Sequence, residues 1–160
     1  MPIEITSAAF NQGRDIPPKY TGEGEDISPP LSWTGVPEDA QELALICDDP
    51  DAPTEDPWVH WVIYKIPADA TGLPAGIGPQ PRLKTPPGIL QGKNSWTMGQ
   101  MIGYRGPMPP PGHGTHRYFF RLYALEAKLA VEPGLSKNAL LQEMHNHVVA
   151  EGCLMGTYQR

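Results

Sequence analysis

A run of prolines and glycines, Gly103–Gly114, leads directly into an alternating segment, Arg117–Leu125. Proline fixes φ and removes a backbone donor, whereas glycine lets backbone N–H groups approach a ligand without an intervening Cβ. The alternation that follows predicts a β-strand. Because His116 and Tyr118 stand where the loop meets this strand, the junction predicts a small rigid pocket for an anion or a polar head group.

Proline and glycine also shape the rest of the chain. There are 20 prolines and 17 glycines among 160 residues, yet 39% of the residues are hydrophobic and 19% are charged, which argues against disorder. Short strands joined by rigid turns fit this composition. We expect one domain over residues 1–160, mostly β with one or two peripheral α-helices, and long enough to bury a core.

Earlier parts of the chain also have strand character. The three segments are Ile3–Phe10, Leu43–Cys47 and Trp58–Ile66. Strict alternation in the third segment predicts two faces, one with His60, Val62 and Tyr64, the other with Val59, Trp61 and Ile63.

One helix is predicted from Ser136 to Glu151. Ser136 is a favourable N-cap residue, and apolar residues recur from there at helical spacing, namely Leu140, Leu141, Met144 and Val148. Gly152 is expected to end this helix, and Leu154–Tyr158 to return as a short strand.

Charge is unevenly distributed along the chain. The net charge of −6 and the pI near 5.3 argue against nonspecific nucleic-acid binding and against electrostatic docking on anionic membranes. The segment Ala70–Leu125 contains no Asp or Glu but six Lys or Arg residues. Such a stretch around a glycine-rich turn favours a bound anion, although ordinary loop composition would also produce it.

The remaining composition argues against several classes of protein and several kinds of site. Cys47 and Cys153 resemble small buried hydrophobes rather than a disulfide or metal pair. The N-terminal residues have neither the basic nor the apolar region of a signal peptide, and no window is long enough to span a membrane. We therefore expect a cytoplasmic protein without membrane insertion or cofactor. A metal held by His113, His116, His60 and Asp49 is disfavoured because these residues form no HxH or HExxH pattern.

The turn Asp49–Pro53 presents two carboxylates in fixed directions because prolines stiffen it. It is either a solvated β-turn or part of a site. Ala52–Pro53 is a candidate cis peptide. Alternation after the loop places His116 and Tyr118 on one face of a strand and Arg117 on the other, where it can pair with a carboxylate such as Asp51.

His60 lies in an aromatic strand with Trp58 on the same face. Such a histidine is either a satisfied core residue or one wall of a pocket. If it lines a pocket with His116, a neighbouring carboxylate would raise its pKa. We then expect phosphate affinity to increase as the pH falls from about 8 to 6.

Several separated motifs carry a resemblance to a known family. They are Asp49–Pro53, Trp58–His60, the run Gly106–Tyr118 and the upstream segment Ile27–Trp33. The chain resembles the phosphatidylethanolamine-binding protein family, also called Raf kinase inhibitor-like proteins, in its bacterial and archaeal branch. The resemblance covers nearly the whole chain. It implies a sandwich of two antiparallel sheets with a small pocket at one end for phosphate or phosphorylated head groups.

The resemblance also implies roles for individual residues. The ligand-binding set is Asp49, Trp58, His60, Gly106, Pro109, Pro110, His116 and Tyr118, and the structural pair is Asp51 and Arg117. This chain departs from the family between Asn94 and Tyr104, which is about three residues longer than the usual run, within a stretch already long for a loop. That difference falls at the expected pocket rim.

Three functional hypotheses follow. The first is a non-catalytic binding or regulatory protein for a small anionic or phosphorylated ligand, acting on a kinase or other enzyme as a monomer or homodimer. The second is a small-molecule hydrolase or isomerase that uses Asp49 with His60 or His116 as an acid–base pair. The third is an interaction scaffold with a vestigial pocket. The first is favoured because no nucleophile, metal set or cofactor motif is evident.

Overall fold

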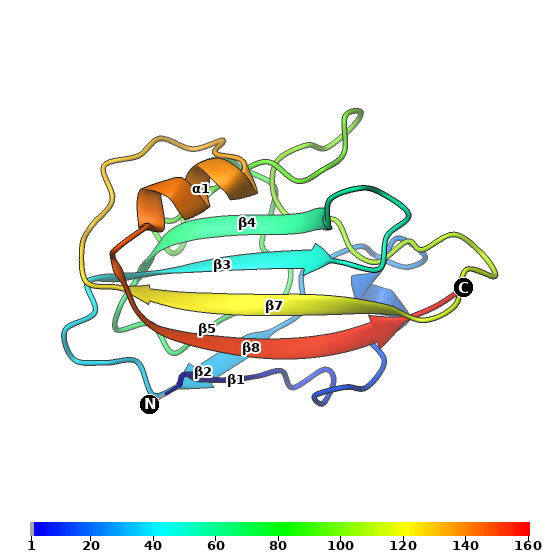
Figure 1. Ribbon diagram of the computed structural model, residues 1–160, viewed down its shortest axis with the longest axis horizontal. Helices are drawn as coiled ribbons and strands as arrows, with labels where there is room; N and C mark the ends of the chain where they lie inside the picture. Colours follow the sequence, from blue (N-terminus) through cyan, green and yellow to red (C-terminus); the bar gives the residue numbers. More distant parts are fainter. Residues whose placement is uncertain (1) are drawn as a thin grey trace.

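The computed structural model describes residues 2–160. Two antiparallel sheets face one another, with the smaller sheet behind the larger one in Figure 1. The smaller sheet has the order β1–β2–β5, with β1 Glu4–Thr6, β2 Leu31–Thr34 and β5 Gly72–Leu73. The larger has the order β6–β4–β3–β7–β8, with β6 Leu90–Gln91, β4 Trp58–Pro67, β3 Glu42–Asp49, β7 His116–Leu125 and β8 Val148–Tyr158. The predicted mostly-β sandwich is confirmed.

Two short helical elements accompany the sheets. A 3-10 turn covers Pro18–Tyr20, and the helix α1 covers Lys137–Met144. Figure 1 shows α1 beside β4, and the helix packs on the outer face of the larger sheet. Within residues 2–160, the structure contains no helix with the length and apolar character that crossing a membrane requires.

The core occupies both faces of β3. All eight residues of this strand are buried. Leu43, Leu45 and Cys47 pack between the sheets, whereas Ala44 and Ile46 pack on the outer face with Leu140 and Met144 of α1. Burial on both sides explains why β3 is a nearly continuous apolar run.

The predicted alternation of β4 holds from Trp61 to Tyr64 but is broken between His60 and Trp61. Cys47 pairs with Trp61 but Asp48 pairs with Val59, so His60 is the extra residue of a β-bulge. The bulge keeps Trp58 and His60 on the inner face and then also turns Trp61 inward. His60 therefore does not share a face with Val62 and Tyr64, which pack in the outer cluster.

The predicted helix is too long. Ser136 does cap it, because its Oγ accepts a hydrogen bond from Ala139 N at 3.1 Å. The helix ends at Met144, however, and Asn146 adopts a φ of 69°. Val148 then begins β8. Gly152 lies inside that strand, where a Cβ would come within 2.3 Å of Ile3 O. Close strand packing, not a helix terminus, requires this glycine.

Several smaller predictions from the sequence also differ from the structure. The first strand ends at Thr6 rather than Phe10. Cys153 is exposed on β8, whereas Cys47 is buried as expected. Among residues 2–160 the cis peptide bond is Thr85–Pro86, so the prediction for Ala52–Pro53 is wrong. The turn there is instead closed by a hydrogen bond from Thr54 N to Ala52 O.

Candidate functional site

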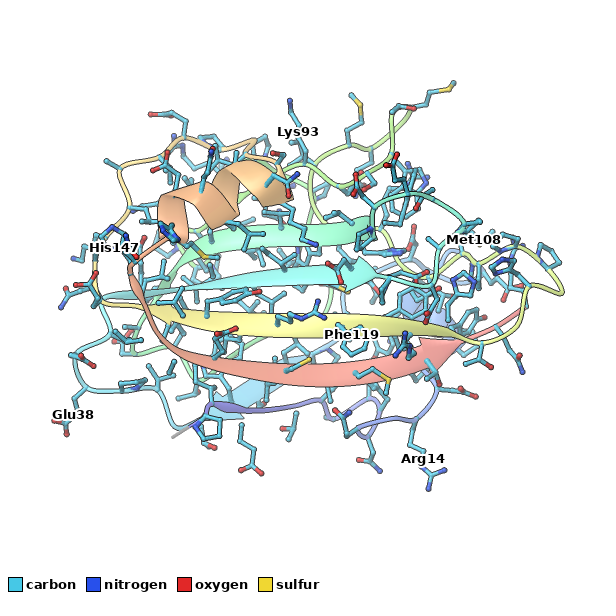
Figure 2. The ribbon with its side chains drawn as sticks, viewed as in Figure 1. Arg14, Glu38, Lys93, Met108, Phe119 and His147 are labelled. Atoms are coloured by element: carbon cyan, nitrogen blue, oxygen red, sulfur yellow. The ribbon has the colours of Figure 1, made fainter. Side chains whose placement is uncertain are left out.

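A cavity of about 270 Å³ lies at one end of the sandwich. Figure 2 shows one of its lining residues, Met108, at the end of the molecule where β3 terminates, with His147 at the other end. The lining residues are Asp49, Ala52, Pro53, Thr54, Trp58, His60, Trp96, Met108, Pro109, Pro110, His116 and Tyr118. Seven of the eight residues in the expected ligand-binding set therefore surround one cavity, and Gly106 does not.

Strand order explains this convergence. β3 ends at Asp49, and its antiparallel neighbours β4 and β7 begin at Trp58 and His116. Asp49 is paired directly with Trp58. Segments far apart in the sequence thus deliver a carboxylate, an indole and an imidazole to the same edge of the sheet.

Asp49, His116 and His113 form a hydrogen-bonded chain. Nδ1 of His116 donates to Oδ2 of Asp49 at 2.6 Å, and the other ring nitrogen of His116, Nε2, lies 2.6 Å from Nδ1 of His113. Oδ1 of Asp49 accepts from Asp51 N at 2.7 Å. Asp49 and His116 are buried, whereas His113 is exposed. The chain runs from the interior of the cavity wall to solvent.

His60 is held differently. Its Nδ1 lies 2.6 Å from Arg105 O and must donate, because a carbonyl oxygen only accepts. Nε2 has no hydrogen-bond partner among residues 2–160. Burial lowers the pKa of His60, and this effect exceeds the opposing hydrogen bond to Arg105 and the charge of Asp49. Asp49 does act to raise this pKa as expected, but desolvation outweighs it, so the expected net increase is wrong.

Tyr118 contributes a hydroxyl to the cavity. This hydroxyl has no hydrogen-bond partner among residues 2–160, although the ring is buried. Within that range, every side-chain nitrogen or oxygen that is sealed from solvent has a hydrogen-bond partner. The Tyr118 oxygen has no partner, so it is accessible from the cavity that Tyr118 lines. Burial raises the pKa of Tyr118 far above its ordinary value, which keeps the hydroxyl protonated and able to donate.

Aromatic rings form the walls. The rings of Trp58 and Trp96 meet edge to face at 5.4 Å between centroids, His60 and Trp96 at 5.2 Å, and His60 and Tyr118 at 5.1 Å. The guanidinium of Arg105 lies 4.6 Å from the centroid of Trp96. These contacts fix the ring orientations around a largely apolar space.

Trp96 was missed by sequence reasoning. It belongs to the unusually long segment Asn94–Tyr104, which was singled out without naming any of its side chains. The buried Asn94 organises this segment: its Oδ1 accepts from Trp96 N at 3.1 Å and its Nδ2 donates to Gly103 O at 3.1 Å. The available sequence signal for Trp96 is its position two residues after Asn94, within a segment already expected at the pocket rim.

At Gly106, Pro109 and Pro110 the proline-glycine loop offers the cavity no backbone donor. Pro109 and Pro110 line the cavity but have no N–H. Gly106 N donates to Asp26 Oδ1 at 2.7 Å, and a Cβ on this glycine would lie 2.2 Å from Tyr20 O. Gly106 therefore serves close packing against the segment before β2, outside the cavity. Farther along the loop, Gly112 N donates to Arg160 O at 3.0 Å.

Arg117 points away from the cavity and pairs with Asp51. Nε and Nη2 each lie 2.9 Å from a carboxylate oxygen, and the backbone N of Arg117 also donates to Asp51 at 2.9 Å. The side chain of Arg117 is 51% exposed. The pair is thus bidentate but lies at the surface, and Arg117's hydrogen bonds lower the pKa of Asp51.

The basic stretch does not make the cavity cationic. None of its six Lys and Arg residues is among the lining residues. Arg121 pairs with Asp48 at 2.9 Å, Arg117 with Asp51, and Arg82 with Glu132 at 3.4 Å. Carboxylates from other parts of the chain thus neutralise much of the segregated charge. Within residues 2–160, no group of three or more His, Cys, Asp or Glu side chains is placed to hold a metal ion.

Comparison with known proteins agrees with the fold. The sequence model of the phosphatidylethanolamine-binding protein family matches residues 6–159. A UPF0098 protein of Methanothermobacter thermautotrophicus is 52% identical over 158 residues, with 99% of each chain covered.

Two solved structures are also similar. A putative phosphatidylethanolamine-binding protein homologue from Chlamydia trachomatis has a TM-score of 0.86 at 41% identity, covering 99% of this chain and 98% of that one. YbcL from E. coli, described as a new member of the mammalian family, has a TM-score of 0.90 at 31% identity, covering 100% and 99%. The chain belongs to the phosphatidylethanolamine-binding protein family.

Proposed function

We propose that this protein is a non-catalytic binding protein whose cavity takes a small phosphorylated ligand, with phosphoethanolamine-like head groups as the chemical class. Family membership supports ligand binding. The observation that carries the finer proposal is that Tyr118 and His60 present an unpartnered hydroxyl and an unpartnered Nε2 to one small cavity. A donor and an acceptor side by side suit a phosphate that carries one proton.

The cavity walls suit the other end of such a ligand. A cation is attracted to the faces of indole rings, and both Trp58 and Trp96 line the space. Asp49 supplies a carboxylate charge in the same wall. Each of its oxygens accepts one hydrogen bond within the protein and can accept a second one from a ligand. A zwitterion with a phosphate and an ammonium therefore complements the cavity better than a bare anion does.

An acid–base enzyme is the second candidate, because the Asp49–His116 hydrogen bond orients an imidazole as general-base catalysis requires. One observation favours binding over catalysis. Of the lining residues, Thr54 and Tyr118 carry the hydroxyls. That of Thr54 donates to Asp56 O at 2.6 Å, and burial raises the pKa of Tyr118 far above its ordinary value, so neither is an activated nucleophile.

Titration calorimetry with phosphoethanolamine tests the proposal. Tyr118→Phe removes only the hydroxyl and should weaken binding about 3- to 10-fold, the effect of one hydrogen bond. Tyr123→Phe is the matched control, since Tyr123 packs in the cluster on the other face of the sheet, and it should bind like wild type. The absence of binding to wild type, or equal binding by Tyr118→Phe, would contradict the proposal. Turnover of the ligand followed by phosphorus NMR would favour the enzyme.

A further inference from the structure

His113 is the one member of the hydrogen-bonded chain that does not line the cavity. It is exposed and stands between Gly112 and Gly114, whose φ angles are +75° and +96°. A Cβ on either glycine would meet nothing within 4 Å. His113 thus sits at an open loop tip between two residues whose backbones are conformationally permissive.

The contact between the two imidazoles restricts their protons. Because Asp49 accepts the Nδ1 proton of His116, a neutral His116 has a lone pair on Nε2. His113 fills that position by donating its Nδ1 proton across 2.6 Å. One further proton can be added on the exposed Nε2 of His113 without disturbing the contact. A second would fall on Nε2 of His116, and two N–H groups would then face each other.

We propose that His113 is a displaceable cap on His116: it occupies Nε2 while the cavity is empty and leaves when His116 acquires a proton there to donate to a bound phosphate group. This inference rests on the proposed function of the cavity. It makes phosphate binding a competition between the ligand and His113, and it couples binding to proton uptake by His116.

Other titratable or charged groups surround the pair. They are Asp49 at the end of β3, Asp51 in the turn after it, His60 on β4, Arg117 and Tyr118 on β7, and Arg160 beyond β8, whose Nε donates to Pro109 O in the loop of His113. Asp49 and Asp51 bring negative charge close to His116, and Arg117 is already paired with Asp51. The negative charges of Asp49 and Asp51 therefore balance the positive charge of the proton that displaces His113.

Phosphoethanolamine and inorganic phosphate binding to two variants tests the cap. His113→Ala leaves Nε2 of His116 open and should bind both probes about 3- to 10-fold more tightly than wild type at pH 7.5. The difference should shrink at pH 5.5, where the cap has left wild type as well. His113→Asn can keep an N–H near the position of Nδ1 and should restore wild-type affinity at pH 7.5. His145→Ala, at an exposed histidine after α1, is the matched control.

Weaker or unchanged binding by His113→Ala at pH 7.5 would overturn the cap. Histidine side-chain NMR of the free protein separates this from failure of the proposed function. Coupled titration of His113 and His116, abolished in His113→Ala, is expected whether or not phosphate binds. If His113 titrates independently of His116, the cap is wrong. If wild type binds neither probe while the coupling is present, the proposed function fails and the imidazole contact stands.

Discussion

Asp49 and His116 are 67 residues apart in the sequence and are joined by a hydrogen bond of 2.6 Å between Oδ2 and Nδ1. Both side chains are nearly inaccessible, at 4% and 2% exposure. The bond fixes the tautomer of His116 and leaves Nε2 as the nitrogen available to other groups. The cap proposed for His113 depends on this orientation.

Replacing the carboxylate tests that dependence. Asp49→Asn keeps the shape of the side chain but removes its charge, so His116 loses the carboxylate that accepts its Nδ1 proton. We expect the free energy of unfolding in urea to fall by about 1–3 kcal/mol, as for a disturbed buried hydrogen bond. Phosphoethanolamine binding should also weaken. Asp56→Asn, at an exposed position in the turn before β4, should change neither; an equal effect there would show that the loss is not specific to the buried carboxylate.

The Arg117–Asp51 pair should contribute little to stability. Although bidentate, it is half exposed and screened by solvent. We expect Arg117→Ala to unfold at nearly the same urea concentration as wild type and to bind phosphoethanolamine equally well. The pKa of Asp51 is lowered in the folded state, so its contribution is present above its ordinary value of 3.8 and is lost as the pH falls through the lowered value. A large loss of ligand affinity in Arg117→Ala would place Arg117 at the site instead.

His60 should make stability pH-dependent in mildly acidic solution. Its folded pKa lies below the ordinary 6.5 because it is buried, so the unfolded chain binds a proton at a higher pH than the folded protein does. The contribution is present in full above pH 6.5 and is lost as the pH falls toward the folded value. Urea unfolding at pH 7.5 and 5.5 should show a smaller difference for His60→Gln than for wild type. Identical differences would mean that His60 titrates normally in the folded state.

Trp96 should select ligands that carry an ammonium. Trp96→Ala removes one aromatic wall and should weaken phosphoethanolamine binding about 3- to 30-fold, while inorganic phosphate binding changes little. Trp96→Phe retains a ring and should have an intermediate effect. Calorimetry with both ligands measures the difference. Equal losses for the two ligands would assign Trp96 to the shape of the cavity rather than to recognition of the cation.

Much of the architecture is predictable from local pattern. Alternation in β7 places His116 and Tyr118 opposite Arg117, and the apolar run of β3 predicts a strand buried on both faces. The end of α1 is not predictable in this way. Val148 continues the helical spacing of Leu140 and Met144, but the chain instead turns at Asn146 and pairs with β7. Only the long-range pairing of β8 with β7 decides between a longer helix and a strand at Val148.

The candidate site is predictable in part for a related reason. Strand alternation predicts that His116 and Tyr118 share a face, whereas the resemblance to the family is what adds Asp49, Trp58 and His60 to the same site. The bulge at His60 and the inward position of Trp96 depend on neighbouring segments, which no local pattern reveals. The glycine-rich loop was expected to donate N–H groups, yet Gly106 is needed for packing against Tyr20. The sequence shows a glycine but not whether close packing or ligand binding requires the absence of a Cβ there.

A crystal structure of the protein with phosphoethanolamine tests the central proposal most directly. We predict that the phosphate lies within hydrogen-bond distance of the Tyr118 hydroxyl and Nε2 of His60, with the ammonium against Trp58 and Trp96. His113 should have moved away from His116. An empty cavity at saturating ligand, or a ligand bound only elsewhere, such as in the groove of about 510 Å³ beside Ser136 and Lys137, would contradict it.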